Sequence, residues 1–223
     1  MGLPGAGGRR DDQLDSCSRQ GILMAQYTVR QRLRDATAPV HEAMHSNRSF
    51  ASLIEGKLTI HEYRTLLARL YGFHFALERQ LCAVPPSVLG DINVRGRERS
   101  AGLKADLSFL GMRPQEIDQL PLCDTRALLE SHVELLGCLY VIEGSGLGGK
   151  VLARKLDSLL GEKTTEGRQF FSGRPAPDRL SWPELCGLLE GQAEHGDIGL
   201  MVASAERTFL ALANWLGEDE IDG

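Results

Sequence analysis

The sequence predicts a single all-α domain, and three features of the chain support this class. Apolar residues between Tyr63 and Leu81 recur in alternating steps of four and three, the spacing of a helix packed on other helices. No segment shows the alternation of apolar and polar residues that is typical of a strand. No repeat or linker divides the 223 residues, which are enough to bury one large core.

Composition and charge exclude several classes of protein. The formal net charge of −5 argues against a general phosphate-binding surface, so we expect no nucleic-acid partner. The longest apolar run, Leu135–Ile142, is far too short to span a bilayer, so we expect no membrane segment. Five widely spaced cysteines without a CxxC pair indicate neither a disulfide framework nor a zinc site. Reduced thiols in a cytoplasmic protein are the expectation.

The two ends of the chain are expected to lie outside the folded domain. Residues 1–26 are rich in Gly, Arg, Asp and Ser and lack the apolar segment of a signal peptide, so a disordered tail is predicted. Met24 is an alternative start to Met1. The helical domain is predicted over residues 27–217, followed by a short tail over residues 218–223.

Capping residues and helix breakers define the expected helices. A first helix should begin after Thr28 as N-cap. Pro39 lies inside it, so a kink or a break is expected just before His41. A loop and short turn should follow over residues 46–58. The same signals predict further helices at about 59–83, 96–110, 125–160, 182–190 and 197–216, with a short helical turn between Pro114 and Pro121.

Four glycines stand inside the predicted helix over residues 125–160, in the sequence LYVIEGSGLGGKVL (139–152). Each glycine costs about 0.5–1 kcal/mol relative to alanine in a helix, so the four cost about 2–4 kcal/mol. Gly144 and Gly148 share one side of the helix, and Gly149 is adjacent. Missing side chains allow a second helix or a flat ligand to approach, and spacing alone favours helix packing. A phosphate-binding loop is excluded because the GxxxxGK[ST] spacing is absent.

The first helix carries a histidine in the company of two arginines. Arg30 and Arg34 lie on the same side of that helix as His41, one to three turns away. A neutral imidazole suits iron, and guanidinium groups suit carboxylates such as the propionates of a haem. The alternative is an amphipathic helix with a solvated basic edge.

Four segments in order along the chain carry a resemblance to a known family. They are ATAPVHEAMH, YVIEGSGLGGKVL, FFSGR and ERTFLALANWL. Together they resemble bacterial haem oxygenases, most closely the biliverdin-producing type associated with bacteriophytochromes, over about residues 30–216. The resemblance implies a single-domain, multi-helix bundle with haem held between the first helix and a kinked glycine-rich helix.

The resemblance also implies roles for residues around the iron. His41 matches the proximal ligand of the haem iron, Arg34 a basic position that pairs with a propionate, and Phe209 an aromatic residue near the haem. His45 stands where the family often has a glutamate that bonds the proximal histidine. The resemblance therefore does not say which residue sets the tautomer and basicity of the His41 imidazole, and His45 is a second candidate ligand of the iron.

The resemblance also implies that the glycine-rich helix covers the opposite side of the haem. Gly144, Gly148 and Gly149 match glycines that lie over iron-bound oxygen. Ser145 stands where mammalian-type members carry an aspartate that orders water. Ser145, Gly144 and Gly148 are thus the expected catalytic positions, and Gly149 is an expected haem contact.

The implied activity is oxidative opening of haem to biliverdin, with release of CO and ferrous iron. It requires O2 and electrons from a ferredoxin- or flavodoxin-type donor or an NAD(P)H-dependent reductase. An apo-bacteriophytochrome is a candidate receiver of biliverdin. Three alternatives remain: a non-catalytic haem carrier of the same fold, a thiaminase-type enzyme using a cysteine such as Cys138, and a helical interaction module.

Overall fold

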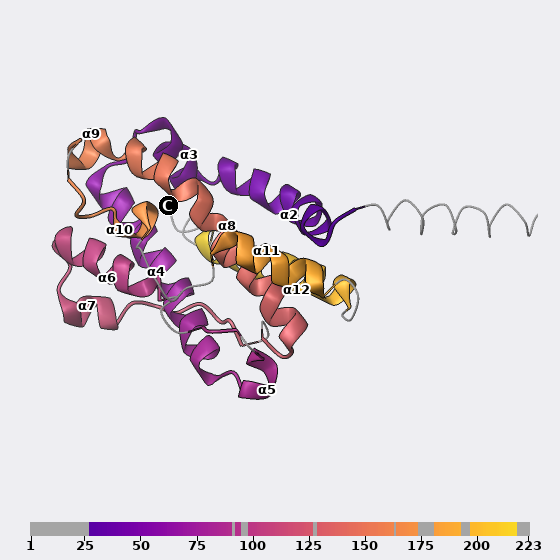
Figure 1. Cartoon of the computed structure of the whole chain (residues 1–223). Coiled ribbons are helices and arrows are strands. Elements are labelled where there is room, and N and C mark those ends of the chain that lie inside the picture. The colour runs from indigo at the N-terminus through magenta and orange to yellow at the C-terminus, as the bar shows by residue number, and fades with distance from the viewer. Residues whose placement is uncertain are drawn as a thin grey trace, which may run out of the picture.

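The structure is a computed structural model that describes residues 27–90, 92–94, 98–126, 129–162, 164–173, 181–192 and 197–217. The two predicted tails, residues 1–26 and 218–223, lie outside these ranges. The described residues form helices without a strand, which confirms the predicted all-α class (Figure 1). The helices are α2 (Val29–Ser46), α3 (Arg48–Glu55), α4 (Ile60–Ala83), α5 (Pro86–Leu89), α6 (Ser100–Phe109), α7 (Pro114–Asp118), α8 (His132–Lys155), α9 (Asp157–Leu160), α10 (Gln169–Ser172), α11 (Trp182–Gly191) and α12 (Ile198–Gly217).

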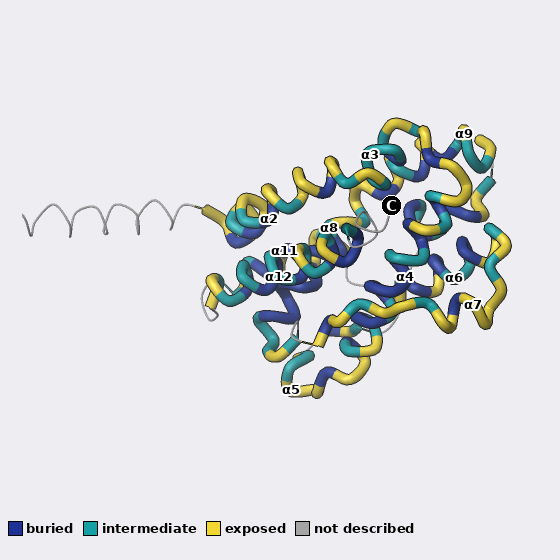
Figure 2. The backbone as a smooth tube through the Cα atoms, turned by 180° about the vertical axis from the view of Figure 1, so that it is seen from behind, coloured by how far each residue is buried: buried dark blue, intermediate teal, exposed yellow. Residues whose placement is uncertain are grey.

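Helix α2 begins as the sequence predicts and passes through its proline. Thr28 forms a capping box with Gln31, and each side chain bonds the other's backbone N–H. Pro39 lies inside α2 without ending it, so a break before His41 is excluded. The helix tolerates Pro39 because its apolar side is buried against the rest of the protein, as the buried positions of α2 show in Figure 2.

Two boundaries differ from the expectation. The predicted loop over residues 46–58 contains helix α3, capped by Asn47 and ended by Gly56 at a φ of 69°. The long helix predicted from residue 125 begins only after Ser131, whose side chain accepts a hydrogen bond from the backbone N–H of Glu134. Helix α8 is then continuous through all four glycines and ends at Lys155, just before α9.

Helix α12 holds the two helices that carry the predicted site. It packs against both α2 and α8, and also against α4. At the α8 contact, any Cβ on Gly137 would collide with the backbone carbonyl of Met201, so glycine permits the close approach. Helices α2 and α8 are thereby fixed on a common support.

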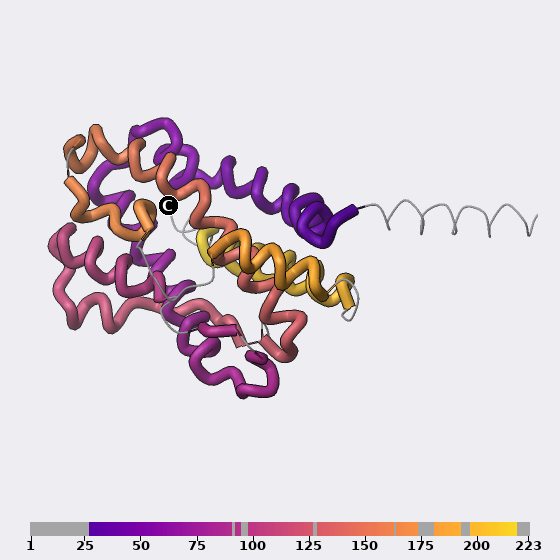
Figure 3. The backbone as a smooth tube through the Cα atoms, viewed as in Figure 1, coloured from indigo at the N-terminus to yellow at the C-terminus, as the bar shows by residue number. Residues whose placement is uncertain are grey.

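The long helices α2 and α8 run in the same direction, as their two ends show. In its first half, α8 meets α2 where the side chain of Tyr140 lies beside that of Thr37. At the other end, a Cβ on Gly56, which follows α3, would lie 3.5 Å from the backbone oxygen of Lys155. The parallel course can be followed in Figure 3.

By length and composition, α8 is the one described helix that could cross a membrane. Half of its apolar 18-residue window is buried inside the protein. A core helix of a folded domain meets the same criteria, so α8 is only weak evidence for a membrane segment.

A buried carboxylate fixes the approach of α10 to α6. Asp106 is fully buried and accepts hydrogen bonds from the backbone N–H groups of Gln169 (2.8 Å) and Phe170 (2.9 Å). Burial raises the pKa of Asp106 from 3.8 to about 6, although these two bonds oppose the shift.

Stability is therefore expected to depend on the protonation of Asp106. The folded state holds this proton more tightly than the unfolded chain, so the free energy of unfolding should fall as pH rises from about 4 to about 6, by the order of 2 kcal/mol. Asp106→Asn should remove this component of the pH dependence in urea denaturation between pH 4 and 7. Equal slopes for the variant and the natural chain would contradict the assignment.

Candidate functional site

The structure places His41 at an exposed position of α2, beside two aromatic rings. The ring of Phe209 on α12 lies edge-on at 6.1 Å between centroids, and the ring of His45 lies at 4.7 Å. The Nδ1 atom of His45 is 3.9 Å from a carboxylate oxygen of Glu42. His41 and Phe209, predicted from opposite ends of the chain, are thus brought together.

The two predicted arginines lie on the same helix, near Tyr140 of α8. Arg30 and Arg34 are both exposed. Burial raises the pKa of Tyr140, while the neighbouring Thr37 hydroxyl and the positive charges of Arg34 and Arg30 oppose the shift. Arg34 also lies 3.4 Å from a carboxylate oxygen of Asp35, so its positive charge is partly balanced.

The four glycines of α8 have different surroundings. A Cβ on Gly144 would lie 3.3 Å from the indole of Trp182, and one on Gly146 would lie 3.9 Å from Nη1 of Arg99. A Cβ on Gly149 would collide with the backbone carbonyl of Phe171. Around Gly148, by contrast, no described atom would lie within 4 Å of a Cβ. Gly149 therefore serves the packing of α10 on α8, and only Gly148 borders open space.

Two large apolar side chains flank Gly148 and are also open to solvent. Leu147 is 60% exposed and Val151 is 58% exposed. With Gly144 and Gly148 they form one side of α8, which we term the Gly148 face. The first half of α8 is largely buried, whereas these apolar groups on its second half are exposed, which indicates a surface that contacts a ligand or partner.

Helical geometry turns the Gly148 face toward His41. Tyr140 meets Thr37, and the two helices run in parallel. His41 lies one turn after Thr37, while Gly144 and Gly148 lie one and two turns after Tyr140. The exposed imidazole and the open glycine therefore lie on facing sides of α2 and α8.

Ser145 points to a different neighbour from the Gly148 face. Its Oγ donates to the backbone oxygen of Ile142 (2.8 Å) and accepts from Nη1 of Arg99 (2.9 Å). Arg99 also donates to the Ile142 oxygen (2.9 Å), and its guanidinium lies 4.4 Å from the ring centroid of Phe170. Sequence reasoning missed Arg99, because no local pattern links it to a serine 46 positions later.

Removing Arg99 should loosen the glycine-containing part of α8. Arg99→Ala deletes both hydrogen bonds to α8 and is expected to lower the free energy of unfolding by about 1–3 kcal/mol. It should also speed amide hydrogen exchange at residues 144–149. Arg126→Ala, which removes an exposed arginine paired locally with Asp124, is the matched control. Unchanged exchange over these residues in Arg99→Ala would refute the role of Arg99.

The surroundings of the cysteines and of the possible metal ligands argue against two alternatives to a haem site. Cys138 is fully buried, and burial raises the pKa of its thiol to about 12. Very little of this thiol is therefore in the reactive thiolate form at neutral pH, which argues against Cys138 as a nucleophile. Within the described ranges, no three His, Cys, Asp or Glu side chains gather closely enough to hold a metal ion.

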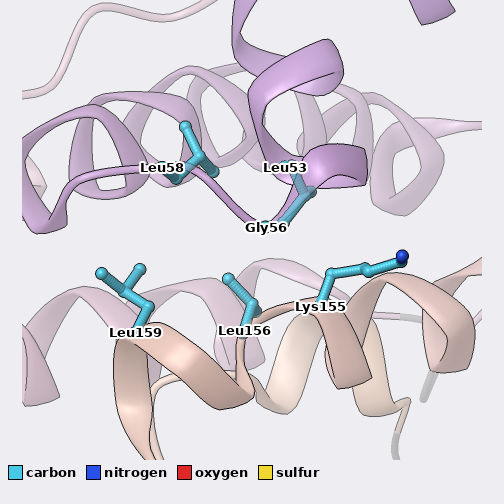
Figure 4. Close-up of a pocket in the computed structure, with 6 residues that line it drawn as sticks. All are labelled: Leu53, Gly56, Leu58, Lys155, Leu156 and Leu159. Atoms are coloured by element: carbon cyan, nitrogen blue, oxygen red, sulfur yellow. The ribbon is translucent and has the colours of Figure 1, made fainter.

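A small cavity lies away from His41 and Gly148. It is a shallow hollow between the α3–α4 connection and the α8–α9 junction, with no enclosed room for even a water molecule (Figure 4). Ligand pockets commonly measure about 300–1,000 Å³, so this hollow cannot take a large planar ligand. Its lining is Leu53, Gly56, Leu58, Lys155, Leu156 and Leu159.

The fold and the facing surfaces of α2 and α8 define an all-α protein with an open, partly apolar surface between two helices. Comparison with models of known protein families shows which family the chain belongs to. The family model described as "Heme oxygenase" matches residues 27–217. The chain therefore belongs to the haem oxygenase family.

Solved structures of bacterial haem oxygenases share the fold. The enzyme from Leptospira interrogans superposes with a TM-score of 0.68 at 21% identity, covering 86% of this chain and 100% of that one. Haem oxygenase-1 from Synechocystis, in complex with haem, gives 0.66 at 15% identity, covering 88% and 94%. Haem oxygenase-2 from Synechocystis, with haem and NO, gives 0.63 at 22% identity, covering 88% and 87%. No curated protein sequence matches the chain significantly.

Proposed function

We propose that this protein opens haem oxidatively to biliverdin, with release of CO and ferrous iron. The observation that carries the proposal is the exposed His41 on α2 beside Phe209, together with the open space at Gly148 on the parallel helix α8. Membership of the haem oxygenase family supports it, as do the haem complexes of the two Synechocystis proteins.

The residues present fit a haem. His41 offers one imidazole, which suits an iron already held by a macrocycle. The open space at Gly148 and the exposed side chains of Leu147 and Val151 suit its flat apolar faces. The guanidinium groups of Arg34 and Arg30 suit its carboxylates.

The histidines and arginines of α2 have separate roles in this proposal. His41 holds the iron from one side, and His45, held near Glu42, orients the His41 imidazole. Arg34 and Arg30 bind the propionates at one end. Haem supplies the iron at which O2 is reduced and the ring that is opened.

The α8 side positions and shields the substrate. Gly148 allows the helix backbone to approach the ring, and its apolar neighbours exclude water. Ser145 supports this wall from beside the Gly148 face, because its hydroxyl donates to the Ile142 carbonyl and accepts from Arg99, which ties this part of α8 in place. Gly149 contributes through helix packing.

The wider setting is part of the same proposal. The catalytic domain spans residues 27–217 and works in the cytoplasm with a ferredoxin- or flavodoxin-type donor or an NAD(P)H-dependent reductase. The motifs at His41 and Gly148 support biliverdin as product, with an apo-bacteriophytochrome as its receiver.

A non-catalytic haem carrier is the second candidate, and the position of His45 favours it. His45 lies one turn after His41 on the same helix, with the two rings 4.7 Å apart, so it can compete with His41 for the same side of the iron and alter the ligation that turnover needs. Titration with hemin, followed by addition of a ferredoxin–reductase system in air, distinguishes the two. A Soret band that converts to the biliverdin spectrum supports the enzyme. A stable complex supports the carrier, and the absence of a complex refutes haem binding.

A further inference from the structure

Helix α11 connects the two sides of the proposed haem site. Near its C-terminus, the Glu190 carboxylate accepts hydrogen bonds from the backbone N–H groups of Val29 (2.9 Å) and Arg30 (3.1 Å) at the start of α2. Nη1 of Arg30 also lies 4.0 Å from Sγ of Cys186. At the other end of α11, Trp182 reaches α8. The position of Trp182 is therefore fixed relative to both α2 and α8.

The indole of Trp182 fills the space over Gly144. A Cβ on Gly144 would lie 3.3 Å from Cη2 of Trp182, which is tighter than ordinary contact. The indole also lies 5.7 Å from the ring of Tyr140, at an interplanar angle of 41°. The side chain of Tyr140 in turn lies beside that of Thr37 of α2. These three side chains join α2, α8 and α11 at one end of the facing surfaces.

The other end of the same surfaces is open. Gly148, one turn beyond Gly144, has no described atom within 4 Å of a Cβ position, and Val151 is 58% exposed. A flat ligand held by His41 can therefore extend over Gly148 and Val151, but Trp182 stops it at Gly144.

Coordination by one imidazole leaves a haem free to rotate in its own plane, because rotation about the iron–nitrogen bond does not change the ligation. Contacts at the edge of the ring must fix that rotation, and side chains that meet its apolar edge act together with the propionate contacts of Arg34 and Arg30. Helix α11 carries no lysine or arginine between Trp182 and Gly191, so Trp182 is its large contact group. A rigid aromatic ring supplies a broad contact surface.

We propose that Trp182 is a specificity-determining residue that forms an end wall for one edge of the haem. It fixes the in-plane orientation and thereby the bridging carbon that is presented for oxidation. This inference rests on the proposed function. The Ser181–Glu184 capping box holds Trp182 at the first position of α11, which supports this role.

The test compares Trp182→Ala, Trp182→Phe and the natural chain. Leu188→Ala is the matched control, because this exposed residue lies away from the buried side of α11. Proton NMR of the cyanide complex of the ferric haem protein reports orientation through the haem methyl resonances. We expect one set in the natural chain and the control, and a second set in Trp182→Ala.

Two further readouts accompany the spectra. Transfer of haem to apomyoglobin should be about tenfold faster from Trp182→Ala, and about twofold to threefold faster from Trp182→Phe. Product analysis should show a second biliverdin isomer from Trp182→Ala. Circular dichroism checks the fold, and Trp182→Phe carries the test if Trp182→Ala does not fold.

The outcomes separate the two proposals. If the natural chain binds and converts haem, while a folded Trp182 variant keeps one set of resonances and the natural transfer rate, the end wall is refuted and the proposed function stands. If the natural chain forms no haem complex, the proposed function fails and the end wall fails with it.

Discussion

Gly148→Leu is expected to weaken hemin binding by about a hundredfold while the protein stays folded. The free protein has room for the new side chain, because no described atom lies within 4 Å of a Cβ at this position. Replacing a helical glycine should even stabilise α8 by up to about 1 kcal/mol. The leucine would, however, occupy the space that the proposed substrate needs. Overpacking of this kind costs about 3 kcal/mol of binding free energy, which corresponds to the hundredfold loss of hemin affinity. Hemin titration and thermal unfolding measure the two effects.

Substitution of the neighbouring Gly149 is expected to affect stability rather than hemin binding. Gly149→Ala places a Cβ against the backbone carbonyl of Phe171, so it should lower the free energy of unfolding by about 1–3 kcal/mol. Hemin affinity of the molecules that remain folded should change less than in Gly148→Leu. Natural hemin affinity in Gly148→Leu would show that the substrate does not lie over this part of α8.

His41→Ala is expected to abolish the spectrum of a histidine-ligated haem and to weaken binding by about a hundredfold or more. Even the residues that only orient a metal ligand commonly contribute about 10–100-fold, so loss of the ligand should have at least this effect. Absorption spectra and hemin titration of the purified variant measure both quantities. Added imidazole should restore the spectrum, because it can enter the space left by the side chain.

His45→Ala is the matched control for the proximal assignment. It should keep the histidine-ligated spectrum, with a shift that reflects the loss of a ring 4.7 Å from His41. An unchanged spectrum in His41→Ala would move the ligand to His45. His74 is a poor substitute, because it is buried against the rings of Phe73 and Phe170, and burial lowers its pKa well below the ordinary value.

Helix starts with a local chemical signature were predictable from the sequence. The capping boxes at Thr28, Thr59 and Ser181 place both partners within three residues, so local pattern is sufficient. The start of α8 at Ser131 was missed, because the apolar sequence before it is equally compatible with a helix. Helix α3 (Arg48–Glu55) was missed because it is short and is held by tertiary contacts around the buried Leu53.

The site was predictable only along individual helices. Spacing and resemblance identified His41 and Gly148, because helical periodicity fixes which residues share a side. They did not separate Gly148 from Gly149, since the difference arises from α10 packing on one of them. Arg99, which precedes α6, and Trp182 of α11 approach α8 from distant parts of the sequence, and a single sequence carries no signal for that contact.

Single turnover of the natural chain tests the central claim most directly. The protein is loaded with one equivalent of hemin, then reduced in the presence of O2, and biliverdin, CO and ferrous iron are counted. The proposed haem oxygenase should yield one equivalent of each per haem consumed. A stable reduced complex, or loss of the Soret band without CO and biliverdin, would contradict it.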